Sequence, residues 1–213
     1  IFMTLERTRT AMDFIVSRFS RLFPAYWAAI AITAAVIYTV GMPEQRIPLA
    51  HLAANATMLQ DVLGFVHLDG SYWTLEVELF FYAQMLFWFM LGQLKRIPWI
   101  IAAWLTITIV YAQTEQHHVH FSYVLRELLI LRHIPFFALG ILFYRIHSHP
   151  DALRSNLVLI ALSLVATGIC YAHAYLVAGI ACSAIFALFV TGRLRWLRKA
   201  SFVFFGGISY SLY

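Results

Sequence analysis

The feature that most constrains this chain is a series of long apolar segments, separated by short stretches that carry most of the charged residues. A run of about 20 apolar residues is long enough to cross a bilayer as a helix. Hydrophobic residues make up 62% of the chain and charged residues 12%, whereas soluble domains are about half apolar and a quarter charged. The sequence therefore predicts an all-α, polytopic transmembrane helix bundle.

We expect about seven spans, the last of them cut off by the end of the chain. The predicted spans are 22–40, 73–94, 99–111, 125–144, 157–172, 176–190 and 202–213. Residues 49–63 are expected to form a short helix that lies at the membrane or dips into it. A tight turn near His173 is predicted to join two short spans, and a single bent element is the alternative there.

The chain begins with Ile1 and ends at Tyr213 inside an apolar run. We interpret it as a fragment that lacks the first helix and the C-terminal end of a longer protein. The fragment, residues 1–213, is expected to form a single transmembrane domain.

The basic residues divide unequally between the two sides of the predicted bundle. If the 6–21 connector lies inside and the spans alternate, twelve of the 15 Lys and Arg residues fall inside. These are Arg7, Arg9, Arg18, Arg21, Lys95, Arg96, Arg145, Arg154, Arg193, Arg195, Arg198 and Lys199, against Arg46, Arg126 and Arg132 outside. Positive residues favour the cytoplasmic side, so the start of the chain is predicted to be cytoplasmic. The net charge of +5 thus comes from basic residues at the ends of the predicted spans, and no nucleic-acid partner is predicted.

Two carboxylates open the second span. Glu76 and Glu78 are about 200° apart around a helix, and Glu78 shares its face with Tyr82. A carboxylate inside a membrane helix is costly, so it is expected to face protein or a wet cavity. The alternative is a well-capped helix start, with Ser71 or Asp69 as the cap.

Three arginines are further candidates. Arg18 and Arg21 are spaced i,i+3 and share a helix face at the inner mouth of the first span. Two guanidinium groups there can bind phosphates, although anchoring to the inner leaflet is the alternative. Arg132 lies inside a predicted span, and as a buried cation it is expected to pair with Glu78 or Glu127.

No metal site is predicted. Cys170 and Cys182 lie in separate apolar spans without metal-ligand spacing. His117, His118 and His120 cluster in a polar loop, but no carboxylate or cysteine pattern accompanies them.

Four elements, in the same order and over nearly the whole chain, resemble the bacterial acyltransferase family 3 membrane proteins. Residues 17–27 resemble the family's RxxR and Leu-x-Pro-x-Tyr signature, and residues 72–82 its Trp-Ser/Thr-Leu-x-x-Glu-x-x-Phe-Tyr element. Residues 132–140 resemble its Arg-x-x-x-Phe-x-x-Gly helix, and residues 206–213 its Gly-x-x-Ser-Tyr-x-x-Tyr motif.

The resemblance implies an inner-membrane O-acyltransferase, of the class that transfers groups other than amino-acyl groups. Such a protein would take an acyl group, often acetyl, from cytoplasmic acyl-CoA and pass it to a hydroxyl of an outer-facing carbohydrate or glycolipid. Acyl-CoA would be the donor substrate, and no tightly bound cofactor is implied. The other partner is the lipid bilayer.

The resemblance also assigns roles to residues of this sequence. They are Glu78 with Arg132 in support for catalysis, Arg18 and Arg21 for the donor, and Trp73 and Tyr82 for substrate binding. Glu76 falls on a variable position of the motif. The family's catalytic histidine lies near the end of a first helix that precedes this chain, so we expect no general base among residues 1–213.

Two other functions stay open. A transporter or lipid flippase would also explain charge inside the membrane, but it predicts repeated halves, and none is visible. A non-catalytic member would act as a partner in polysaccharide assembly. A histidine upstream of Ile1 would favour catalysis over this last function.

Overall fold

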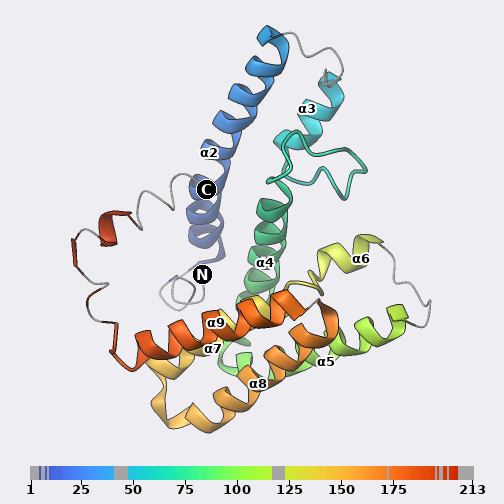
Figure 1. The fold of residues 1–213 in the computed structure, drawn as a ribbon. Coiled ribbons are helices and arrows are strands. Elements are labelled where there is room, and N and C mark those ends of the chain that lie inside the picture. Colours follow the sequence, from blue (N-terminus) through green and yellow to red (C-terminus); the bar gives the residue numbers. More distant parts are fainter. Residues whose placement is uncertain are drawn as a thin grey trace. The chain divides into compact units, whose positions relative to one another are not determined.

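The computed structural model describes residues 5, 8, 10–40, 48–116, 123–171, 173–194, 196, 199–200 and 202–205 (Figure 1). Within these ranges the chain forms helices, turns and loops without a strand, which confirms the predicted all-α fold. The histidine cluster at 117–120 and the motif at 206–213 lie outside the described residues. The chain divides into two compact units, Ile1–Ile97 with Thr114–His133 and Pro98–Gln113 with Ile134–Tyr213.

The first unit is built on α2, a helix of 30 residues over Ala11–Val40. The helix begins eleven residues before the predicted start of the span at residue 22, because the amphipathic stretch before that span continues the helix without a break. Where the membrane span itself begins stays a prediction. Pro24 therefore lies in the helix interior, where it removes one backbone hydrogen bond. The buried side chains recur every three to four residues along much of one face and are Phe14, Arg18, Leu22, Tyr26, Ile30 and Ile37.

Two helices pack against α2: the short α3 (Leu49–Ala56) and α4 (Trp73–Met90) (Figure 1). Helix α3 starts where it was predicted but ends at Ala56, well before the predicted end at residue 63. The Tyr26 hydroxyl donates to the Asn55 carbonyl at 2.8 Å. The Tyr26 and Tyr72 rings meet edge to face, 4.9 Å apart. Tyr72 directly precedes α4, so α4 begins beside the middle of α2 and not beside its Val40 end.

The start of α4 differs from the predicted cap. Tyr72 occupies the N-cap position, and no side chain caps the helix. Instead, the Ser71 backbone N–H and hydroxyl both donate to Asp69 Oδ1, at 2.8 and 2.6 Å. These two bonds hold the pKa of the Asp69 carboxyl below its usual range. Asp69 and Ser71 thus form a turn before the helix, and the predicted capping role was wrong.

The span predicted over 125–144 is broken. It consists of α6 (Tyr123–Leu128), a turn in which Ile130 has a φ of 46°, and α7 (Ile134–Ser148). Pro135 favours this break, because proline suits the first turn of a helix but not its interior. Arg132 lies in the turn with its side chain exposed, so the expectation of a buried arginine within a span was wrong.

The second unit contains most of α5 (Ile97–Gln116), together with α7, α8 (Leu153–Cys170) and α9 (His173–Val190). The 3-10 turns η2 (Leu94–Arg96) and η3 (Pro150–Ala152) precede α5 and α8. Helices α7, α8 and α9 pack on one another. A Cβ added at Gly179 would lie 3.3 Å from Leu164 Cδ2, so glycine permits the close approach of α8 and α9. These are two separate helices, as the predicted turn near His173 requires.

Four helical segments of the described chain are long and apolar enough to cross a membrane. They are Ala11–Val40, Leu94–Thr114, Pro150–Cys170 and His173–Val190. A multi-pass membrane protein is therefore supported, while the count of seven spans stays a prediction. Helix α4 is not among the four, because Glu76, Glu78 and Gln84 interrupt its apolar sequence.

The orientation predicted from the basic residues can be measured with single cysteines at Gln116 and Lys199, in a protein whose Cys170 and Cys182 are replaced. In intact cells an impermeant maleimide should label position 116 and not position 199. Labelling after membrane disruption controls for the reactivity of both sites. The reverse labelling pattern would overturn the orientation.

Candidate functional site

Three of the residues predicted for the site meet between α2 and α4. The Arg18 guanidinium lies over the Tyr82 ring, with its central carbon 5.3 Å from the ring centroid. The Tyr82 hydroxyl donates a hydrogen bond to Glu78 Oε1, one turn away on the same helix. Phe14 also belongs to this cluster. Its ring contacts Tyr82 edge to face, and its centroid lies 5.4 Å from the central carbon of the Arg18 guanidinium.

The Arg18 side chain is only 6% exposed. Its Nε and Nη1 atoms have no hydrogen-bond partner among the residues that the structure describes. A buried cation with unsatisfied donors is costly, whereas guanidinium donors bind carbonyl, carboxylate and phosphate oxygens well. Arg18 is therefore placed to bind an oxygen-rich ligand beside Tyr82 and Glu78.

The other predicted residues lie around this cluster. Arg21 is one turn from Arg18 on α2, but its side chain is exposed, so the two arginines share a helix face and differ in environment. Trp73, at the start of α4, is 45% exposed. The centroid of its ring lies 5.5 Å from that of the His133 ring, at an interplanar angle of 34°. His133 directly follows Arg132 in the sequence.

The predicted partners of Arg132 have contacts of their own. Glu127 Oε1 accepts from Arg126 Nε at 2.9 Å, and Glu78 accepts from Tyr82. The pairing of Arg132 with either carboxylate stays a prediction.

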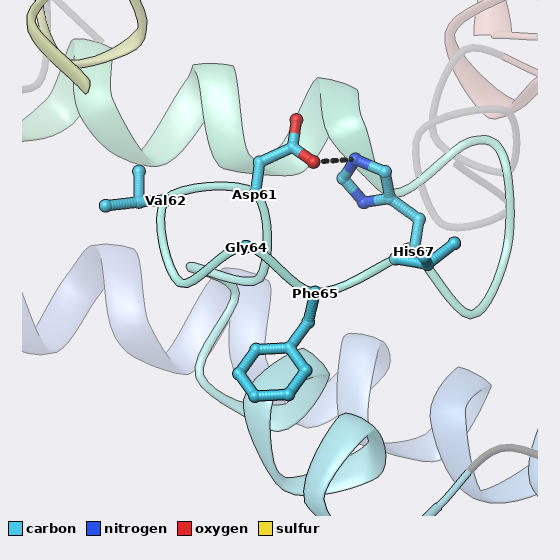
Figure 2. Close-up of a pocket in the computed structure, with 6 residues that line it drawn as sticks. Asp61, Val62, Gly64, Phe65 and His67 are labelled. Atoms are coloured by element: carbon cyan, nitrogen blue, oxygen red, sulfur yellow. Dashed lines mark ion pairs between the residues drawn. The ribbon is translucent and has the colours of Figure 1, made fainter. Parts of the chain in front are cut away.

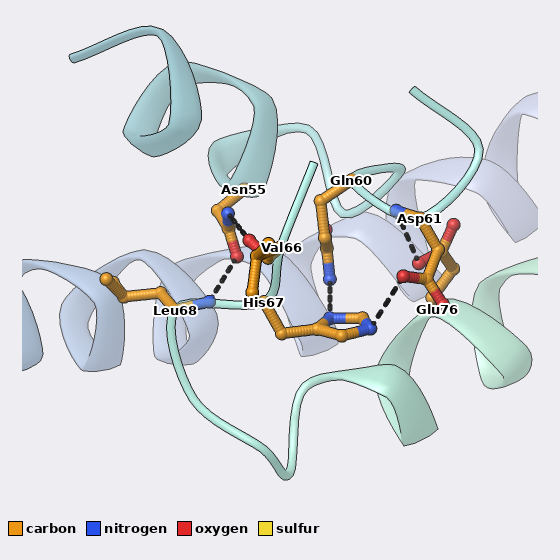
Figure 3. Close-up of polar contacts among 7 residues, drawn as sticks. All are labelled: Asn55, Gln60, Asp61, Val66, His67, Leu68 and Glu76. Carbon is orange, nitrogen blue, oxygen red and sulfur yellow. Dashed lines mark hydrogen bonds and ion pairs between the residues drawn. The ribbon is translucent and has the colours of Figure 1, made fainter. Parts of the chain in front are cut away.

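A second polar cluster lies in the connector before α4 and was not found from the sequence. Figure 3 shows a chain of contacts from Gln60 through His67 and Asp61 to Glu76. Gln60 Nε2 lies 2.8 Å from His67 Nδ1, and His67 Nε2 lies 2.9 Å from Asp61 Oδ1. The Asp61 backbone N–H donates to Glu76 Oε2 at 3.4 Å.

Asn55 holds the connector in this shape. Its side chain is fully buried, and its Nδ2 donates to the Val66 carbonyl at 3.0 Å while its Oδ1 accepts from the Leu68 N–H at 2.9 Å (Figure 3). Buried backbone groups need such internal partners, because an unpaired N–H or C=O away from water is costly. The amide of Asn55 therefore stabilises the loop that presents Asp61 and His67.

Asp61 and His67 also line an open pocket in the connector (Figure 2). The other lining residues are Val62, Gly64, Phe65 and Val66. Asp61, His67 and Glu76 each offer one metal-ligating atom, and these three atoms lie within 4.8 Å of one another. The three residues come from a loop and a helix with no regular spacing, so no sequence motif marks them as a group.

A family model described as an acyltransferase domain matches residues 1–213. No curated protein and no solved structure matches the chain.

Proposed function

Because this chain belongs to acyltransferase family 3, we propose that it is an integral membrane O-acyltransferase that acts at the Arg18–Tyr82–Glu78 cluster. The donor is cytoplasmic acyl-CoA, with acetyl as the first choice of acyl group, and the acceptor is a hydroxyl of an outer-facing carbohydrate or glycolipid. The observation that carries the proposal is the buried Arg18 guanidinium, whose Nε and Nη1 atoms have no partner among the described residues. It lies over the ring of Tyr82, whose hydroxyl donates to Glu78.

Arg18 and Arg21 fit two parts of one donor molecule. Attack on a thioester places negative charge on its carbonyl oxygen, and donors fixed in a buried site stabilise that charge strongly. The buried Arg18 fits this oxygen. The exposed Arg21 fits the phosphates of coenzyme A, which stay in contact with water. A guanidinium group binds phosphate well because it is planar and offers several N–H donors.

Glu78 and Tyr82 fit the acceptor side of the reaction. The acceptor hydroxyl attacks the thioester carbon and its proton goes to a general base. The carbon–sulfur bond then breaks, and the base returns the proton to the sulfur to release the thiol of coenzyme A. Glu78 orients either the acceptor hydroxyl or the general base. The exposed Trp73 ring, packed near the half-buried His133, suits the apolar face of a sugar ring.

The location that fits this function is a bacterial inner membrane, with the start of the chain on the cytoplasmic side. Its support is the distribution of Lys and Arg along the sequence. This orientation brings the Arg21 end of α2 to the side where acyl-CoA is found.

The full-length protein in proteoliposomes, given acyl-CoA labelled in its acyl group and glycolipid from the producing cells, should transfer label to the glycan. Heat-denatured protein and the Glu78→Gln variant serve as controls for uncatalysed transfer. Movement of the glycolipid across the bilayer without label in the glycan would instead identify a transporter or flippase. The third outcome is that the protein alone neither acylates the glycan nor moves the glycolipid, while acylation takes place once a second protein is added. That outcome would identify the chain as a non-catalytic partner.

A further inference from the structure

We propose that Asp61, His67 and Glu76 bind a divalent transition-metal ion of the zinc type, between the connector and the first turn of α4. The site is separate from the Arg18–Tyr82–Glu78 cluster and does not depend on the acyl transfer proposed above. One imidazole nitrogen and two carboxylate oxygens are typical ligands of such ions.

The spacing of the three ligating atoms is close to that of a metal site. All three lie within 4.8 Å of one another, while two ligands of one zinc ion lie at most about 4 Å apart, since each is about 2 Å from the metal. A small rotation of the side chains closes this difference. The short contact of 2.9 Å between His67 Nε2 and Asp61 Oδ1 is then replaced by two bonds to the ion.

The charge balance of the cluster favours a cation. Glu76 is 4% exposed, and its Oε1 has no hydrogen-bond partner among the described residues. Two carboxylates lie here, and the described ion pairs of this unit, His67–Asp61 and Arg126–Glu127, bring no Lys or Arg to either. A protonated His67 offsets one negative charge at most, whereas a divalent ion offsets both and takes up the free oxygen of Glu76.

Gln60 supplies the outer contact that metal-bound histidines commonly have. A histidine that binds metal through Nε2 donates its Nδ1–H to a nearby oxygen. Gln60 is fully buried, its amide lies 2.8 Å from His67 Nδ1, and its Oε1 has no partner among the described residues. A half-turn of the Gln60 amide exchanges its oxygen and nitrogen and brings that oxygen to the imidazole.

The metal would link the connector before α4 to α4 itself. Asp61 and His67 come from the connector, and Glu76 comes from the first turn of the helix. Asp61 and His67 line the open pocket, which gives the ion a path to the site. Three protein ligands leave one position of a tetrahedral ion for water or another oxygen ligand.

The test is calorimetric titration of Zn²⁺ into chelator-treated full-length protein in lipid nanodiscs. His117, His118 and His120 are replaced by alanine in every sample, so that they contribute no zinc binding. We expect one Zn²⁺ per chain, no detectable binding in the His67→Gln or Glu76→Gln variants, and about 10- to 100-fold weaker binding in Gln60→Ala. Asp69→Asn, which removes an exposed carboxylate of the same connector, should bind as the parent does.

Gel filtration and thermal unfolding without zinc establish that each variant is folded. Zinc should raise the unfolding temperature of the parent and of Asp69→Asn, raise that of Gln60→Ala by less, and leave that of His67→Gln and Glu76→Gln unchanged. Absence of stoichiometric binding in the parent, or unchanged binding in His67→Gln, would overturn the site. Because the readout is binding, a protein that binds zinc but transfers no acyl group would refute the proposed function and leave the metal site standing.

Discussion

Replacing Glu78 by glutamine is expected to remove most acyl transfer from the full-length protein while leaving its membrane insertion unchanged. The carboxylate is half-buried and accepts from the Tyr82 hydroxyl. Glutamine keeps the size of the side chain but neither the charge nor the second acceptor oxygen. General acid–base catalysis contributes about 100- to 10,000-fold to the rate of a reaction. Because Glu78 is proposed to orient that proton transfer, we expect kcat to fall by at least about 100-fold in Glu78→Gln.

Two further variants locate the effect. Tyr82→Phe keeps the ring against Arg18 and removes only the hydroxyl donor, so it should give a smaller loss. Asp69→Asn changes an exposed carboxylate outside the cluster and should keep full activity. The measurement is acylation of the native glycan per amount of membrane-inserted protein. If Glu78→Gln matches the wild type, Glu78 has no part in the site.

The second large effect is expected at Arg18. Arg18→Ala removes a buried cation with two donors that have no described protein partner, and the loss of one oxyanion donor costs about 100- to 1,000-fold in kcat. Arg18→Lys should also be strongly impaired, because an ammonium group does not reproduce the planar fork of a guanidinium.

Arg21 is the matched comparison on the same helix. Its side chain is exposed, so Arg21→Ala should raise KM for acyl-CoA and change kcat little, as expected for a contact made equally in the ground and transition states. Steady-state kinetics over acyl-CoA concentration separate the two patterns. Equal effects of Arg18→Ala and Arg21→Ala on KM alone would assign both arginines to the phosphates. Full activity of Arg18→Lys and of Arg21→Lys would mean that the two arginines act only as membrane anchors.

Local periodicity predicted the faces of α4 correctly. The sequence separates Glu76 from Glu78, and the structure finds Glu78 bonded to Tyr82 on one face and Glu76 under the connector on another. These relations follow from the angle between successive residues of a helix, so no knowledge of the neighbouring elements is required.

Relations between elements were not predictable in the same way. Arg18 and Arg21 share a face by spacing, but only Arg18 is buried, because the position of α4 against α2 decides which side chain is covered. That position depends on the path of the connector, where Asn55 bonds to backbone groups at Val66 and Leu68. The cluster of Asp61, His67 and Glu76 follows from the same path and therefore has no signal in the spacing of its residues.

The start of α4 beside the middle of α2 has an electrical consequence. Tyr26 meets Tyr72 at the start of α4, and Arg18 lies about 12 Å further along the axis of α2, whereas the hydrocarbon core of a bilayer is about 30 Å thick. The two contacts are therefore separated along the axis of α2 by less than half of that thickness. A charge that crosses the whole bilayer gains about 2.3 kcal/mol per 100 mV, so a charge that moves only between these two positions on α2 gains a fraction of that energy.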